Sequence, residues 1–287
     1  MKLTDMLPLE GWPHAENRVS SDLRWCAADT EEAFRKNGGH HLYDESSITY
    51  RLNSQGYRCP EFEDTASIRM ISIGCSHTFG VGLPQDALYH ELFAKRLGSE
   101  LGLGVTNWNL GSGGASNNYI ARLLHLTVPK LKPDLVLIFF SYFSRREYVA
   151  ANNRSIKYLP KFQYPDPVLQ DISNNLSNLT SEYDDQLSFF RDYKSIEALL
   201  AGRLWAFSFV NPRGISDIVG HLDSRFRTRD YRRVDRARDH SHLGPKTHFD
   251  IYECYWDWLN RTDGLEKLKV IADARLHSGD GFVANSR

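Results

Sequence analysis

The sequence predicts an α/β fold in which three layers, α/β/α, are built around a mainly parallel sheet. From residue 68 onward, apolar runs of strand length alternate with longer segments whose apolar residues recur at helical spacing. One run, 135–140, is apolar throughout, which is typical of a strand buried on both faces. Ser76, Gly114 and Ser141 each follow one of the first three runs, at the sheet edge where the crevice of such a fold lies.

Two strand–helix units begin the alternation. Residues 68–73 are predicted as a short apolar strand, and 105–110 as a second strand. Ser116 is expected to cap a helix that runs through Lys130, since a serine hydroxyl accepts from the N–H groups of a first helical turn. A helix is also predicted over 86–101, with apolar positions at Leu88, Leu92, Phe93 and Leu97.

Two further units complete the sheet. The run 135–140 is the third predicted strand and 204–210 is the fourth. Helices are expected over 182–201 and 247–259, and the second of them packs its aromatic side chains on the core. Strands that alternate with helices in this way are typical of a doubly wound, flavodoxin-like sheet.

The remaining segments are expected to surround this core. In the N-terminal part, 20–36 is predicted as a helix, 48–52 as a strand and 53–56 as a turn. A stretch at about 151–180 is rich in Asn, Pro and Ser and is predicted as an irregular insertion. The expected organisation is an N-terminal cover, a main domain, and a C-terminal helix with a tail, at residues 1–65, 66–265 and 266–287.

Composition narrows the function classes. Of the 287 residues, 41% are hydrophobic and 12% aromatic, which is enough for a large core. The net charge of −1 gives no global field for nucleic acid or a membrane surface, and neither partner is expected. No apolar run approaches the roughly 20 residues that cross a bilayer. The first 17 residues lack an apolar signal core, which predicts a cytoplasmic location.

Two short segments carry the candidate chemistry. Ser76 follows the first strand in a small-residue turn that presents its hydroxyl. Asp239 and His242 stand three residues apart, so one turn of chain places both side chains on the same side. Asp239 can then orient the imidazole while His242 accepts a proton. A nucleophile, a base and an orienting acid activate a hydroxyl for attack on a carbonyl.

These segments resemble the SGNH (GDSL-like) hydrolases. Residues 74–78 are similar to the first sequence block of that family, and 109–117 are similar to the second. Residues 239–245 resemble the fifth block closely. The resemblance covers roughly residues 67–259. It implies a nucleophile, a general base and an orienting acid at Ser76, His242 and Asp239.

The same resemblance implies an oxyanion hole. Its donors are expected to be the backbone N–H groups of Ser76 and Gly114, with Gly111 and Gly113 as competing positions in the glycine turn. In the family's third block a strand ends in Gly-x-Asn, and that asparagine is a further donor. Phe143 falls at that position in this chain.

A different third donor is therefore expected at this strand end. Ser144 and Arg145 are the main candidates, because their side chains leave the chain near where the asparagine would reach the substrate. Ser141 and Tyr142 are weaker candidates. Arg145 would be the stronger donor because it is charged, and it could also hold an anionic group.

Other interpretations of the same residues are weaker. Cys75 stands beside the nucleophile, but Ser76 holds the matching position, and the cysteines as a set are expected to be free buried thiols. The neighbouring histidines suggest a metal only at first sight, since no cysteine or carboxylate pattern around them fits a zinc site. They are His77, His240, His242 and His248. No metal and no cofactor is expected.

Seven arginines precede Asp239 within a short segment. They are Arg225, Arg227, Arg229, Arg232, Arg233, Arg236 and Arg238. One interpretation is a solvated face, partly neutralised by Asp230 and Asp235. The other is an anion-binding wall beside the active site, with Arg232 and Arg233 as its candidates, because arginine binds phosphate and carboxylate bidentately. RNA binding is a weaker alternative, since no RNA-binding motif accompanies the segment.

The sequence as a whole favours a serine esterase or deacylase that works through an acyl-enzyme on Ser76. Its substrate would be a small-molecule or carrier-linked ester, either sugar-like or anionic. Two alternatives stay open. An O-acyltransferase would use the same three residues, and a non-catalytic ligand-binding protein could be built on a degenerate hydrolase fold.

Overall fold

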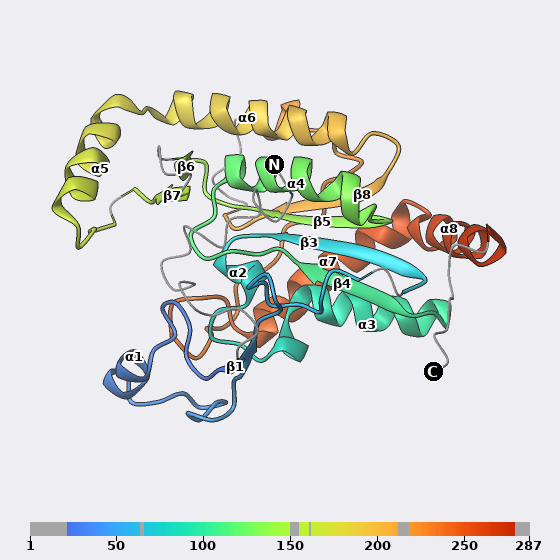
Figure 1. Ribbon diagram of the computed structural model, residues 1–287, viewed down its shortest axis with the longest axis horizontal. Coiled ribbons are helices and arrows are strands. Elements are labelled where there is room, and N and C mark those ends of the chain that lie inside the picture. The colour runs from blue at the N-terminus through green and yellow to red at the C-terminus, as the bar shows by residue number, and fades with distance from the viewer. Residues whose placement is uncertain (1–21, 64–65, 150–154, 161, 212–217, 279–287) are drawn as a thin grey trace.

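A computed structural model describes residues 22–63, 66–149, 155–160, 162–211 and 218–278, and a four-stranded sheet lies at its centre (Figure 1). The strands are β3 (Ile68–Gly74), β4 (Val105–Asn109), β5 (Leu135–Phe140) and β8 (Leu204–Phe209). Their spatial order is β4-β3-β5-β8, and every neighbouring pair is parallel. The predicted parallel sheet is therefore confirmed, with the first strand inside and the chain winding outward to both edges.

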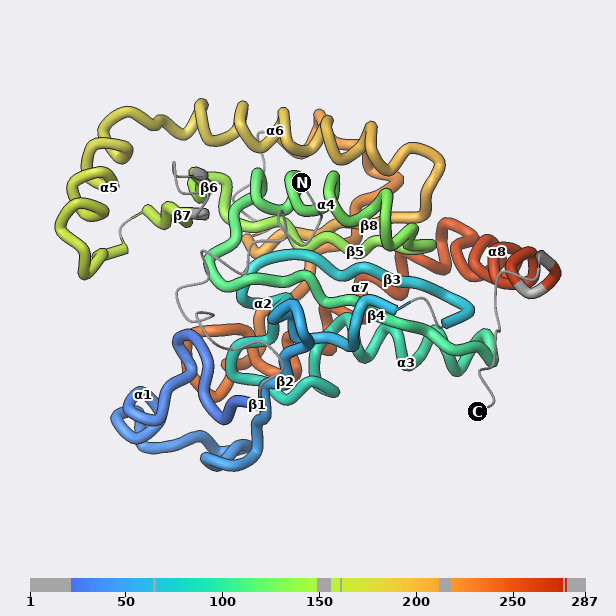
Figure 2. The backbone as a smooth tube through the Cα atoms, viewed as in Figure 1, coloured from blue at the N-terminus to red at the C-terminus, as the bar shows by residue number. Residues whose placement is uncertain are grey.

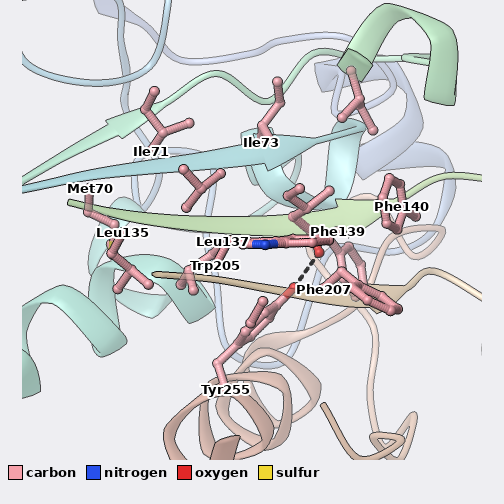
Figure 3. Close-up of a cluster of buried hydrophobic side chains, with 14 of the residues drawn as sticks. Met70, Ile71, Ile73, Leu135, Leu137, Phe139, Phe140, Trp205, Phe207 and Tyr255 are labelled. Atoms are coloured by element: carbon pink, nitrogen blue, oxygen red, sulfur yellow. Dashed lines mark hydrogen bonds between the residues drawn. The ribbon is translucent and has the colours of Figure 1, made fainter. Parts of the chain in front are cut away.

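The central strand β5 is apolar because both of its faces are covered. All six of its residues are fully buried. Figure 3 shows its side chains packed with those of β3 and β8, including Ile73, Phe139 and Phe207. The hydroxyl of Tyr255 donates to the carbonyl of Ile138 at 2.6 Å and so joins a covering helix to the strand.

Helices cover both faces of the sheet and give the three predicted layers. On one face α4 (Asn117–Leu131) packs on α6 (Glu182–Leu199), and on the other α3 (Tyr89–Leu101) packs on α7 (Pro245–Arg261) (Figure 1). The last helix, α8 (Gly264–Ser278), is tied to the sheet through Arg275 and Asp134 at 2.7 Å. In the part of the chain described, no helix is both long and apolar enough to cross a membrane.

A serine cap fixes the start of α4, and a separate 3-10 turn delays the start of α3. The Ser116 hydroxyl accepts the N–H of Tyr119 at 3.3 Å, which confirms the predicted cap of α4. Helix α3 begins at Tyr89, three residues after the expected start, because Gln85–Ala87 forms a separate 3-10 turn, η2. A second 3-10 turn, η4, spans Val219–His221.

The irregular insertion predicted at about 151–180 is wrong for much of its length. Strands β6 (Arg146–Val149) and β7 (Ser155–Tyr158) form an antiparallel hairpin, and α5 spans Pro167–Leu179. Asp166 caps α5 by accepting two backbone N–H groups, and a proline fits the first helical position because it needs no donor there. The polar composition thus hid a capped helix. Residues 150–154 and 161 lie outside the described residues.

The N-terminal cover also departs from its prediction. The helix expected over 20–36 is confined to α1 (Glu31–Lys36), and the strand expected over 48–52 to β2 (Tyr50–Arg51). Strand β1 (Asp22–Leu23) pairs with β2 instead of being helical. Helix α1 begins late because the Thr30 hydroxyl accepts a backbone N–H of the first turn at 3.1 Å. Residues 20 and 21 lie outside the described residues.

A buried ion pair fastens this cover to the core. Asp29 and Arg238 have fully buried side chains and are joined by two hydrogen bonds of 3.0 and 2.7 Å. The Arg238 guanidinium also lies 4.0 Å from the ring centroid of Trp25. Figure 2 shows the blue N-terminal segment beside an orange loop of the C-terminal half. The cover is therefore an integral part of the folded unit.

Replacing Asp29 by alanine should leave the Arg238 guanidinium buried beside no carboxylate from the cover. We expect a loss of about 3–5 kcal/mol in the free energy of unfolding, measured by urea titration. The matched control is Asp22→Ala, which removes an exposed ion pair with Arg51 and should cost no more than about 1 kcal/mol. Equal losses in the two variants would show that the buried pair is not the anchor.

Candidate active site

Ser76 stands at the carboxyl edge of the sheet, where β3 turns into a short helix. Cys75 caps α2 (Ser76–Phe79), and Gly80 ends it with a left-handed φ of 84°. The turn is tight, since a Cβ on Gly74 would lie 2.2 Å from the Thr78 hydroxyl oxygen. Ser76 is 8% exposed, so most of the residue is enclosed.

Arg58 holds the loop that follows this helix. Its guanidinium is fully buried and donates to the carbonyls of Gly80 at 2.7 Å and Leu83 at 2.9 Å. It also lies 4.5 Å from the ring centroid of Tyr50 in the N-terminal cover. Sequence analysis missed this residue, because an isolated arginine gives no local signal of burial.

Asp239 and His242 form a closed pair, as their spacing predicted. The imidazole Nδ1 of His242 donates to Asp239 Oδ2 in a short hydrogen bond, and the backbone N–H of His242 donates to Asp239 Oδ1 at 3.0 Å. Ser241 adds its hydroxyl at 2.6 Å and its backbone N–H at 3.1 Å. The carboxylate therefore has donors on both oxygens.

The charge state of this pair follows from its hydrogen bonds. Burial alone would raise the pKa of Asp239, but the donors and the neighbouring charge of His242, with the Ser241 hydroxyl, hold that pKa far below its usual range. Asp239 thus remains ionised and keeps the His242 proton on Nδ1. The other ring nitrogen, Nε2, is left with a lone pair that can accept a proton.

Close backbone contacts bring the loop after α2, residues 80–83, and the turn of residues 237–242 together. The N–H of Arg238 donates to the carbonyl of Gly82 at 2.9 Å. A Cβ on Gly82 would lie 2.9 Å from that of Ala237, and its φ is +76°, so only glycine fits. The rings of His77 and His242 lie 5.1 Å apart, centroid to centroid. The structure therefore brings His242 beside the neighbour of Ser76.

His77 is best explained as a neutral packing residue. Burial, followed by the charges of His242 and His248, places its pKa well below the usual value. The Arg145 and Arg233 guanidinium groups act in the same direction. Among the residues described, no three His, Cys, Asp or Glu side chains gather as metal ligands. All four cysteines are buried free thiols, as predicted.

The glycine turn of residues 111–114 lies directly on helix α2. A Cβ on Gly111 would lie 2.4 Å from the backbone nitrogen of Phe79. The N–H of Ser112 donates to the carbonyl of Gly74 at 3.1 Å, and the N–H of Ala115 closes the turn onto Ser112 at 3.0 Å. Gly114 has a φ of +71°. The predicted second donor therefore sits in a turn that is fixed to the strand carrying Ser76.

The third-block position points away from this turn. The Phe143 ring stacks on Phe189 of α6 at a centroid distance of 4.2 Å. Phe143 and Ser144 line a cavity of about 170 Å³ against α6 and the end of β8. Arg145 instead donates to the Ser141 hydroxyl at 3.0 Å, across the Tyr142 ring. Of the two candidate third donors, Arg145 therefore stays at the end of β5, and Ser144 faces the cavity toward α6.

Asn117, the first residue of α4, ties the end of β5 to the segment that follows the glycine turn. Its amide accepts the Ser141 N–H at 2.9 Å and donates to the Ser141 carbonyl at 3.2 Å. The two loops that follow β4 and β5 are thus held at one separation by a buried side chain.

The arginine-rich segment is mostly structural. Four of its members pair with carboxylates: Arg225 with Asp223, Arg227 with Asp230, Arg229 with Asp250 and Asp257, and Arg238 with Asp29. Arg233 and Arg236 both donate to the Ser241 carbonyl, at 3.2 and 2.9 Å, and so stabilise the turn that carries Asp239 and His242. The side chain of Arg232 is exposed. The anion-binding role of Arg232 and Arg233 stays a prediction.

No family model and no curated protein matches the sequence. Among solved structures, the chain is similar to the lipase Lip_vut3 from a goat rumen metagenome, at 13% identity and a TM-score of 0.43, over 67% of this chain and 97% of that one. It is similar to a mutant of Axe2, an acetyl-xylooligosaccharide esterase from Geobacillus, at 11% identity and a TM-score of 0.41, over 68% and 95% of the two chains. A lipolytic protein of the G-D-S-L family from Desulfitobacterium hafniense is 13% identical with a TM-score of 0.31, over 67% and 99%.

Proposed function

We propose that this protein is a serine hydrolase that cleaves esters through an acyl-enzyme on Ser76. The observation that carries the proposal is the Asp239–His242 pair, held against the turn that presents Ser76. A buried ionised carboxylate that fixes the tautomer of an adjacent imidazole is the arrangement that a general base requires. The resemblance of the three sequence segments to SGNH hydrolases supports the same roles.

In the proposed reaction His242 Nε2 takes the proton of Ser76 as its oxygen attacks the ester carbonyl. The carbonyl oxygen becomes negative and is held by the N–H groups of Ser76 and Gly114. Because Ser76 is the first residue of α2, its N–H has no carbonyl partner within the helix. His242 then protonates the departing alcohol. Water attacks the acyl-enzyme in the same way, and the acid leaves with Ser76 restored.

Active-site labelling tests this function directly. A fluorophosphonate should label the wild-type protein, which should also hydrolyse p-nitrophenyl acetate. Ser76→Ala and His242→Ala should each lose turnover almost completely, and the double variant should lose little more, because the residues act as a unit. Asp239→Asn should be milder.

The control for labelling is Ser46→Ala, which changes an exposed serine in the cover. It should label and turn over like the wild type. If the wild-type protein neither labels nor hydrolyses esters of any acyl length, the fold is serving a binding role. Full activity in His242→Ala would show that another group is the base.

We further propose that Arg145 substitutes for the third-block asparagine. It follows the same strand as that asparagine would, and its side chain donates to the Ser141 hydroxyl at the end of that strand. Arg233 donates to the carbonyl of Ser241, next to His242, and with the exposed Arg232 would face an anionic part of the substrate. A phosphorylated or carboxylated ester is therefore the proposed substrate class.

Arg145→Ala should lower kcat on p-nitrophenyl acetate by about 10-fold or more, as expected for one lost oxyanion donor. Ser144→Ala should stay near the wild-type value, because Ser144 lines the cavity toward α6. The control Arg225→Ala removes an exposed guanidinium paired with Asp223. Unchanged kcat in Arg145→Ala would mean that the backbone donors suffice.

A further inference from the structure

Lys157 reaches the glycine turn from the β6–β7 hairpin. Its ammonium donates to the Ser112 hydroxyl at 2.6 Å and to the Gly113 carbonyl at 2.9 Å. Its stem covers Gly114, since a Cβ there would lie 3.6 Å from Lys157 Cδ. No step of the proposed reaction uses this residue, and nothing in the sequence singled it out.

The carbonyl that Lys157 binds belongs to the peptide that carries the proposed oxyanion donor. The Gly113 C=O and the Gly114 N–H are the two ends of one planar, trans peptide unit and point in opposite directions. A cation on the carbonyl therefore lies on the side away from the N–H. Fixing one end of this unit fixes the direction of the other.

The conformation of the turn explains why the orientation of this peptide has to be fixed. The hydrogen bond from Ala115 to Ser112 closes the turn of residues 112–115. Gly114, the third residue of the turn, has a φ of +71°, whereas the φ of Gly113 is not in the left-handed region. A closed turn with a positive φ at its third residue but not at its second is typical of type II. Type I differs mainly by rotation of the central peptide, and two glycines offer little steric resistance to that rotation. A flipped peptide would present a carbonyl where the donor should be.

We propose that Lys157 is a positioning residue that locks the Gly113–Gly114 peptide in its donor orientation and polarises it toward a developing negative charge. This inference rests on the proposed serine hydrolase function and adds a requirement to it. The oxyanion N–H would be supported by a cation from the hairpin, a segment outside the three family-like blocks. Such support compensates in part for the missing third-block asparagine.

The surroundings of Lys157 make its charge sensitive to pH near neutrality. Burial of the ammonium lowers its pKa, Glu147 on β6 opposes this shift, and Arg122 on α4 and Arg145 after β5 reinforce it, so that the pKa is about 7. The Tyr119 ring of α4 lies 5.2 Å from Nζ. Glu147 is itself held by Arg122 at 2.6 Å. Because the pKa of Lys157 is lowered in the folded protein, the ammonium loses its proton as the pH rises through about 7. The charge that supports the glycine turn is lost with it.

The test compares pH profiles of three full-length variants on p-nitrophenyl acetate between about pH 5 and 9. In the wild type, kcat/KM should rise with deprotonation of the base and fall again above pH about 7. Lys157→Met should lower kcat by about 10- to 100-fold with KM nearly unchanged, and the alkaline fall should disappear. Lys157→Arg should recover most of kcat and also lose the alkaline fall, since arginine stays charged.

Lys130→Met, at an exposed position in the last turn of α4, is the matched control and should keep the wild-type profile. Melting temperatures of all variants separate loss of folding from loss of function. A wild-type kcat and alkaline limb in a folded Lys157→Met would overturn the positioning role while leaving the hydrolase intact. Equal loss in Lys157→Arg and Lys157→Met would also overturn it. A wild-type protein that is inert at every pH would overturn the proposed function, and the inference would fall with it.

Discussion

The buried ion pair between Asp29 and Arg238 is the contact on which the arrangement of the site depends. Arg238 directly precedes Asp239, so the pair fixes the start of the turn that carries Asp239 and His242. Asp29 also accepts the Tyr50 hydroxyl at 2.5 Å, and that hydroxyl accepts the Gly82 N–H at 2.7 Å. An unpaired buried charge is costly. These contacts therefore bind the N-terminal cover, the loop after α2 and the turn that carries Asp239 into one cooperative unit.

Glycines let the backbone segments of this unit approach each other. Gly74, Gly82 and Gly111 each lie where a Cβ would meet backbone or core atoms within 3 Å. The first permits the tight strand-to-helix turn at Ser76. The second admits the turn that carries Asp239, and the third seats the oxyanion turn on α2. The site is thus assembled from close backbone contacts, and the charged side chains of Arg58, Arg238 and Lys157 hold those contacts in place.

The parts of the fold that local sequence patterns specify were predictable. The apolar run of β5, the serine cap of α4 and the Asp239–His242 spacing all follow from rules that act over a few residues. The parts that depend on distant partners were not. Arg58 and Arg238 belong to segments that look solvated in sequence, and burial shows only when Tyr50 and Asp29 fold over them.

Two segments misled the sequence analysis for a related reason. The apolar residues of 20–36 suggest a helix, but pairing of β1 with the distant β2 and the Thr30 cap restrict it to α1. The polar stretch that contains α5 and β7 suggests a loop, yet its hairpin delivers Lys157 to the glycine turn. Composition alone cannot show such a contact, because it depends on the pairing of β6 with β7 and on the packing of this hairpin against α4.

The central claim is that Ser76, His242 and the Gly113–Gly114 peptide form one reacting centre. A crystal structure of the protein after reaction with a fluorophosphonate tests this most directly. The account predicts phosphorus on Ser76 Oγ, a phosphoryl oxygen about 2.7–3.1 Å from the Gly114 nitrogen, and Lys157 still bound to the Gly113 carbonyl. A label on any other residue, or a phosphoryl oxygen directed away from the glycine turn, would contradict it.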